Sequence, residues 1–230
     1  MNVHKIRLGS VNSYIVKCEQ GFLLIDAGQP HQIDTFKQEC LRRDIPPEEF
    51  EFIFITHEHY DHVGSLYEIK GITRAFVITQ TLASQTISEG EIVIPAGTNW
   101  FFKILSTLGK RFEKNTKYTP LMPEMKIPVD MDLHDFGIDA VALLTPGHSR
   151  GSISLVFDSG DAFVGDTCFN IYPKYIKSVF PPFADDVPEL LKSWEKLLNT
   201  DAKMFYPGHG EPFPRELLIK TFERKKKHFS

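Results

Sequence analysis

Histidine and aspartate side chains that could bind a metal are concentrated in three short parts of the chain. Five of its nine histidines fall within residues 56–62, 145–149 and 206–210. Imidazole nitrogens bind zinc, iron, nickel and copper, and carboxylate oxygens complete the ligand sets of such ions. Three segments of this composition predict a catalytic transition-metal site, because randomly scattered histidines would rarely gather in this way.

The first segment reads Thr-His-Glu-His-Tyr-Asp-His over residues 56–62. In an extended segment residues i and i+2 point to the same side, so His57 and His59 can reach one ion together. If the chain then turns into a helix at Asp61, the side chains of Asp61 and His62 point elsewhere and can hold a second ion close by. The segment therefore indicates a centre for two metal ions.

Short apolar runs predict the strands that must position these side chains. Buried β-strands are expected at residues 21–26 and 52–56, and the first histidine-rich segment starts where the second of them stops. Further strands are expected at residues 13–18, 75–79, 141–145, 152–157 and 162–165. Apolar residues at helical spacing predict helices over residues 30–44, 187–198 and 215–228.

This order of elements predicts an α/β fold. Two mixed β-sheets would lie face to face with helices on the outer faces, as an αββα sandwich. A chain of 230 residues is long enough for one substantial core, so we expect a single domain over residues 1–230.

Residues 95–128 interrupt the pattern and indicate an inserted, partly helical flap. Apolar side chains recur along it at Trp100, Phe101, Ile104, Leu105 and Leu108. In one interpretation the flap and the aromatic residues after Asp166 cover an apolar pocket suited to an acyl chain. Tyr172 would then be hydrogen-bonded to the substrate carbonyl or leaving group. In the other, the apolar stripe packs on its own domain or on a second copy of the chain in a homodimer.

The motifs resemble those of the metallo-β-lactamase superfamily over nearly the whole chain. His57, His59, Asp61 and His62 form the H-x-H-x-D-H signature. Residues 24–28 (Leu-Ile-Asp-Ala-Gly) are similar to the family's early strand and aspartate. The remaining motifs follow in the family's order, at residues 146–148 (Pro-Gly-His), 165–167 (Gly-Asp-Thr) and 207–210 (Pro-Gly-His-Gly).

The resemblance implies a metallo-β-lactamase fold with two divalent ions, zinc by default, although iron or manganese suits the same ligands. It assigns the first ion to His57, His59 and His148. It assigns the second ion to Asp61, His62 and His209, with Asp166 bridging both. Asp26 would orient ligand imidazoles without binding an ion.

Other polar residues of these segments have simpler interpretations. Glu58 lies on the opposite pleat face from His57 and His59, so we expect it to be solvated and not catalytic. His4, His31, His134 and His228 have no neighbouring ligands in the sequence, and each is expected to be an ordinary structural or surface residue.

Composition limits the partners. The net charge of −4 gives no overall basic field, so a small-molecule substrate is expected and nucleic acid is not.

Three widely spaced cysteines without a CxxC motif suggest reduced thiols. No signal-peptide core or membrane-spanning run is present, so a cytoplasmic protein without a membrane partner is expected.

The favoured function is metal-dependent hydrolysis of a small ester, thioester or lactone, as in glyoxalase II-like enzymes, with Asp61 managing the proton of the attacking water. Asp166 stands where some lactamases have a cysteine, which argues against antibiotic hydrolysis. One alternative is a phosphodiesterase acting on RNA or cyclic nucleotides, with residues 224–228 as a basic patch. The other is an iron-dependent redox enzyme similar to the sulfur dioxygenases of the superfamily.

Overall fold

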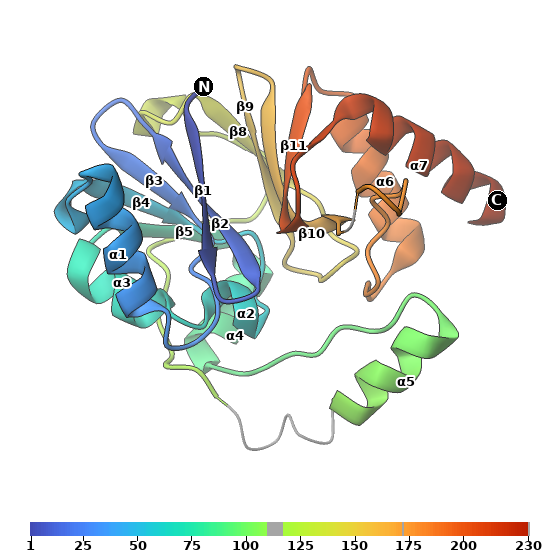
Figure 1. Cartoon of the computed structure of the whole chain (residues 1–230), viewed down its shortest axis with the longest axis horizontal. Helices are drawn as coiled ribbons and strands as arrows, with labels where there is room; N and C mark the ends of the chain where they lie inside the picture. Colours follow the sequence, from blue (N-terminus) through green and yellow to red (C-terminus); the bar gives the residue numbers. More distant parts are fainter. Residues whose placement is uncertain (110–116, 172, 230) are drawn as a thin grey trace.

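Two six-stranded sheets lie face to face with helices outside them (Figure 1). The computed structural model describes residues 1–109, 117–171 and 173–229. The first sheet has the order β1-β2-β3-β4-β5-β6, in which β1, β2 and β3 are antiparallel and β3 to β6 are parallel. Its strands are β1 (Val3–Leu8), β2 (Val11–Lys17), β3 (Phe22–Ile25), β4 (Phe50–Phe54), β5 (Phe76–Gln80) and β6 (Met125–Ile127).

The second sheet has the order β12-β11-β10-β9-β8-β7. Only its β10–β11 pair is parallel. Its strands are β7 (Met131–Asp132), β8 (Ala140–Leu144), β9 (Ile153–Phe157), β10 (Asp161–Asn170), β11 (Met204–Gly210) and β12 (Phe213–Pro214). Both sheets are mixed, which confirms the predicted αββα sandwich.

Helices cover the outer face of each sheet (Figure 1). On the first sheet lie α1 (Ile33–Arg43), α2 (Tyr60–Val63), α3 (Leu66–Thr73) and α4 (Thr81–Glu89). On the second lie α6 (Val187–Leu198) and α7 (Arg215–Phe229). Short 3-10 turns occupy Pro47–Glu49 and His134–Phe136. The structure thus has three apolar layers: one between the sheets and one under each set of helices.

Strand β3 shows why the predicted strands are continuously apolar. Leu23 and Ile25 join the core between the sheets, whereas Leu24 joins the core under the helices. Successive side chains of a strand point to opposite faces, so a strand buried on both faces must be apolar at every position.

The strand ends gather the histidine-rich segments at one edge of the sandwich. Strands β3 and β4 are parallel, so Asp26 and His57 follow them at the same edge. In the second sheet, Asp166 belongs to β10 and His209 to β11, and the loop after β8 carries His148. Helix α2 begins at Tyr60, which confirms the predicted turn into a helix at the end of the first segment.

The inserted flap is only partly as expected. Helix α5 (Trp100–Gly109) confirms its helical part, and Figure 1 shows α5 set apart from the other helices. The expected boundary at residue 128 is wrong, because Met125–Ile127 forms β6 and pairs with β5 in the first sheet. A strand this short has little periodic signal of its own. Residues 110–116 and Tyr172 lie outside the described part of the structure.

Among the described residues, no helix is both long and apolar enough to cross a membrane.

Candidate metal centre

The fold brings all seven predicted ligands together. Their donor atoms form three overlapping groups, each with its atoms within 4.8 Å of one another. The groups are His57, His59 and His148; His57, His62 and Asp166; and Asp61, His62 and His209. His4, His31 and His134 are in none of the groups found among the described residues, as expected, and the side chain of His228 lies outside them.

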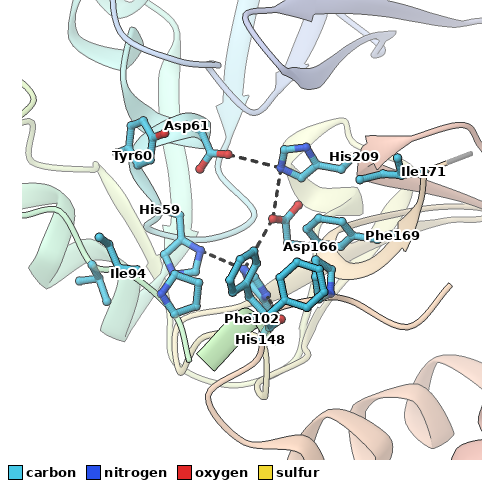
Figure 2. Close-up of a pocket in the computed structure, with 14 residues that line it drawn as sticks. His59, Tyr60, Asp61, Ile94, Phe102, His148, Asp166, Phe169, Ile171 and His209 are labelled. Atoms are coloured by element: carbon cyan, nitrogen blue, oxygen red, sulfur yellow. Dashed lines mark hydrogen bonds and ion pairs between the residues drawn. The ribbon is translucent and has the colours of Figure 1, made fainter. Parts of the chain in front are cut away.

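Asp166 lies at the middle of the cluster (Figure 2). Its Oδ2 atom is 3.9 Å from His57 Nε2, 3.6 Å from His148 Nε2 and 3.4 Å from His209 Nε2. Its Oδ1 atom is 3.3 Å from His62 Nε2. This carboxylate lies near histidines of both predicted ion sites. It is therefore placed to bridge two ions, as the resemblance of the sequence implied.

Hydrogen bonds behind the cluster fix which nitrogen faces inward for three of the imidazoles, those of His57, His62 and His148. His148 Nδ1 donates to the carbonyl oxygen of Phe183 at 2.9 Å, so its Nε2 keeps a lone pair for an ion. His62 Nδ1 contacts Asp26 Oδ2 at 2.7 Å, which directs its Nε2 toward Asp166 in the same way. Such partners orient ligand imidazoles in metal sites and raise their basicity.

Asp26 connects two strands to the cluster. Its Oδ1 accepts from the backbone N–H of Thr56 at 2.8 Å, and its Oδ2 accepts from the Thr56 hydroxyl at 2.9 Å. The same hydroxyl oxygen lies 3.0 Å from His57 Nδ1 and accepts from it. Asp26 adopts the left-handed conformation, with φ of 60°, a strain that structures retain where the geometry serves a site. The outer role predicted for Asp26 agrees with these contacts.

A glycine allows the last ligand loop to approach the others. A Cβ atom on Gly208 would lie 2.4 Å from Asp166 Oδ1 and 2.5 Å from His62 Cε1. A larger residue would therefore push the His209 loop out of the cluster.

Several buried donor atoms of the cluster have no hydrogen-bond partner among the described residues. They are His57 Nε2, His59 Nε2, His62 Nε2 and Asp166 Oδ1. Leaving buried polar atoms unpaired costs free energy, and such atoms in a native structure call for an ion or another partner. His59 Nδ1 and His148 Nε2 lie 2.9 Å apart, close enough to face a single ion. The residues present thus fit two divalent cations.

The histidines of the two predicted ion sites differ in their protonation states. Burial, with His62 nearby, holds the pKa of His57 well below its usual value, and burial with His148 beside it lowers the pKa of His59 to about 3. Burial also disfavours charge at His62 and His209, but neighbouring carboxylates outweigh it. Asp166 and Asp26 raise the pKa of His62 well above the usual range, and Asp166 and Asp61 raise that of His209 to about 9.

A cavity of about 500 Å³ opens onto the cluster (Figure 2). Cluster residues in its wall are His59, Asp61, His148, Asp166 and His209. The rest of the wall is mainly apolar and is formed by Tyr60, Val93, Ile94, Pro95, Phe102, Phe169, Ile171, Pro182 and Phe183. Pro95 and Phe102 of the flap and Pro182 and Phe183 after Asp166 are therefore part of the wall of this cavity. No lysine or arginine of the described residues lines this cavity.

The prediction that Glu58 is solvated is wrong. Its carboxylate is buried and accepts a hydrogen bond from Ser149 Oγ at 2.9 Å. The prediction considered only the pleat of the strand, but β4 ends at Phe54 and the loop of residues 148–152 covers the following residues. A Cβ atom on Gly151 would lie 2.5 Å from Glu58 Oε2, so this loop packs directly on the carboxylate. Glu58 joins the two loops that carry His59 and His148.

Sequence reasoning missed the residues that hold the His209 loop. Asn12 Nδ2 donates to the carbonyl oxygens of Pro207 at 3.1 Å and Gly210 at 2.7 Å. The Tyr14 hydroxyl donates to the same Pro207 oxygen at 2.7 Å. Both residues lie on β2, nearly 200 positions away in sequence, and no local pattern marks them as part of the site.

Comparison with known proteins agrees with this site. The sequence model of the metallo-β-lactamase superfamily matches residues 6–209. The "Probable metallo-hydrolase YflN" of Bacillus subtilis is 25% identical over 232 residues, which cover 91% of this chain and 84% of that protein. A hydroxyacylglutathione hydrolase of Bartonella quintana is 26% identical over 173 residues, which cover 74% of this chain and 53%, about half, of that enzyme.

Solved structures share the fold. TTHA1623, solved in a di-iron-bound form, has a TM-score of 0.70 at 23% identity, with 95% of this chain and 98% of that chain covered. BJP-1, a subclass B3 metallo-β-lactamase of Bradyrhizobium japonicum, has a TM-score of 0.66 at 19% identity, with 99% and 90% covered.

Two mixed sheets with a His/Asp cluster at their shared edge define a metallo-hydrolase of the αββα sandwich class. The chain belongs to the metallo-β-lactamase superfamily.

The two ions should differ in the protons they displace. In the metal-free protein near neutral pH, His57 and His59 are neutral, whereas His62 and His209 carry protons, because their pKa values are raised. An ion bound by Asp61, His62 and His209 must release those protons, so its affinity falls by about tenfold per pH unit for each proton displaced as the pH drops below their pKa values. Titrating metal-free protein with Zn²⁺ in weak buffer containing a pH indicator measures the release. Equal release from both equivalents would contradict this assignment.

Removing the Glu58 carboxylate should weaken metal binding. Glu58→Ala deletes the link between the His59 and His148 loops, and losses of supporting contacts of this kind typically reduce metal affinity by about 10–100-fold. Glu58→Gln keeps an acceptor oxygen for Ser149 and should bind metal nearly as tightly as the parent. Competition against a chromogenic chelator measures the affinities, and Glu51→Ala on the exposed side of β4 is the control. If Glu58→Ala bound metal as well as Glu51→Ala, the bridging role would be wrong.

Proposed function

We propose that the protein hydrolyses a small ester, thioester or lactone with water activated at a two-ion centre, zinc being the first choice and iron or manganese compatible with the same ligands. One observation supports this most directly: the His/Asp cluster opens onto a largely apolar cavity whose described wall has no lysine or arginine. An uncharged acyl compound suits such a wall, because no ion pair is needed to bind it.

Divalent ions bound to the cluster would supply Lewis acidity and a nucleophilic water near neutral pH. The chain's own residues then have separate tasks. Asp26, Thr56 and the Phe183 carbonyl hold the imidazoles in one orientation, so no reorganisation is needed during the reaction. The apolar wall excludes bulk water from the acyl group, which strengthens electrostatic interactions with the reacting carbonyl.

Asp61 is placed to accept a proton and then donate it. Its side chain is half-buried, lines the cavity and lies 3.3 Å from His209 Nε2 through Oδ2 (Figure 2). Burial opposes its ionisation, but the hydrogen bond from His209 and the nearby His62 lower its pKa below the usual value. Asp61 is therefore ionised at neutral pH and can accept a proton from the attacking water before passing it to the leaving group.

The phosphodiesterase alternative has less support. A phosphodiester carries a negative charge, and the described wall of the cavity has no lysine or arginine to bind it beside the cluster itself. The basic residues expected to form a nucleic-acid patch lie on α7, on the outer layer of the second sheet. There Lys225 lies 3.8 Å from the ring centre of Phe180, and Lys226 pairs with Glu195 at 3.4 Å. The relatives that act on an acylglutathione favour a thioester among the candidate substrates.

A panel of substrates should separate the candidate activities. Zinc-loaded protein is expected to hydrolyse a thioester, an aryl ester or a lactone and to leave a phosphodiester dye intact. Exhaustive chelation should abolish the activity, and adding back Zn²⁺, Mn²⁺ or Fe²⁺ should show which ion restores it. Turnover of the phosphodiester alone would favour the nuclease alternative, and oxygen uptake by the iron-loaded protein would favour the redox one.

Asp61→Asn should reduce kcat by about 10²–10⁴-fold, the range for loss of a positioned proton acceptor, because the amide cannot take a proton. Metal content must be measured on the same sample by elemental analysis, since Asp61 also belongs to the second ligand group. Unchanged turnover at full metal content would remove Asp61 from proton transfer.

A further inference from the structure

We propose that the substrate carries a linear apolar acyl chain, which extends from the metal centre through the first cavity into a second cavity behind it. The inference rests on the proposed hydrolase function and adds the substrate class and its orientation.

The second cavity adjoins the first. It has a volume of about 310 Å³ and shares Phe102, Phe169, Ile171 and Pro182 with the cavity at the cluster. The two spaces thus meet at these four side chains. The proposed acyl chain would run past this shared wall from the ligands toward Ile176, which is 48% exposed and lines the second cavity but not the first.

The wall of the second cavity suits a hydrocarbon. Its apolar members include Phe180 and Pro181, and none of the described residues that line it is charged. Two of its polar side chains already have partners within the protein. Thr98 Oγ1 donates to the carbonyl oxygens of Pro181 and Pro182, and Asn99 Oδ1 accepts from the backbone N–H of Phe102. An apolar chain therefore loses little by entering, whereas a charged group would lose its hydration without gaining a partner.

A third cavity also adjoins the first and differs from it in charge. It measures about 600 Å³, shares His209 and Ile171 with the first cavity, and is lined by Arg7 and Lys174. Its acidic residue, Glu211, is paired with Lys5 at 2.6 Å. The cavity at the cluster therefore adjoins both an uncharged cavity and a cavity whose described lining has two cationic side chains. This asymmetry sets the orientation, with the acyl chain toward Phe102 and the leaving group toward Arg7.

Contacts between aromatic rings hold the wall shared by the first and second cavities in place. Phe102 of α5 packs edge-on against Phe183 at 5.2 Å, and Phe169 stacks on the imidazole of His209 at 4.7 Å. Phe102 and Phe169 therefore bring the wall of the acyl path into direct contact with the loops that carry the ligands. A substrate chain that lies along these rings would hold its carbonyl group beside the cluster.

The chain-length series uses acyl chains from acetyl to dodecanoyl with the ion-loaded protein, and is measured once with a neutral and once with a negatively charged leaving group. We expect kcat/KM to rise by up to about fourfold per added methylene, the effect of burying one such group, until the second cavity is filled. Ile176→Trp narrows the far end only. It should leave acetyl turnover unchanged, while the gain for the longest chains falls by at least about tenfold.

Two control variants test whether the effect of Ile176→Trp is specific to the second cavity. Leu82→Trp places the same side chain at another exposed position, on α4, outside the cavities described here, and should behave like the parent. Arg7→Gln, in the third cavity, should leave the chain-length dependence unchanged and reduce kcat/KM only for leaving groups with a negative charge. Metal content and circular dichroism show whether each variant is folded and loaded.

The outcomes separate the two levels of the proposal. If short esters are hydrolysed but chain length has no effect, or if Ile176→Trp has no effect on long chains, the acyl path is refuted and the hydrolase function remains. If Arg7→Gln removes the chain-length effect instead, the proposed orientation is refuted. If the loaded protein hydrolyses no member of the series, the ester and thioester assignment fails, and the acyl path fails with it.

Discussion

The site depends on a concentration of buried imidazole and carboxylate groups that the protein alone does not satisfy. The ring centres of His57 and His62 are 4.1 Å apart, and those of His57 and His59 are 4.6 Å apart. Several inward-facing donor atoms have no hydrogen-bond partner in the described structure. Burying such groups is unfavourable unless a charge of opposite sign lies between them. A pair of divalent cations would relieve this cost and become part of the folded structure's stability.

The arrangement of strands makes this concentration sterically feasible. Parallel strands β3 and β4 place Asp26 beside Thr56, and the Asp26 carboxylate after β3 then binds both the backbone of Thr56 and the imidazole of His62 after β4. The second sheet supplies Asp166 and His209 from its own parallel pair. Because each sheet is buried on both faces, its strand ends have little freedom to move apart. The rigid frame holds ligands from distant segments in one place.

The surroundings of the cluster show how a common metal centre acquires its own substrate preference. Its ligands come from the family motifs, whereas the cavity walls come largely from the loop before α5, from α5 itself and from the loop at Pro182 and Phe183. Gly97 forms an isolated β-bridge with Phe183, so the two wall segments are joined to each other. Substrate preference can therefore change through these segments without disturbing the ligands, as expected where a scaffold carries variable loops.

The sequence by itself determined the αββα sandwich and the seven residues of the cluster. The continuous apolar run of β3 and the ligand spacing of the His57 segment are local properties, whereas His148, Asp166 and His209 were assigned through the resemblance of their motifs to the superfamily. Glu58, Asn12, the short strand β6 and the cavities were decided only by the tertiary structure. Each depends on contacts between segments far apart in the chain: Ser149 on Glu58, Pro207 on Asn12 and β5 beside β6. No local pattern records such contacts, because they arise only when the two sheets and their loops pack together.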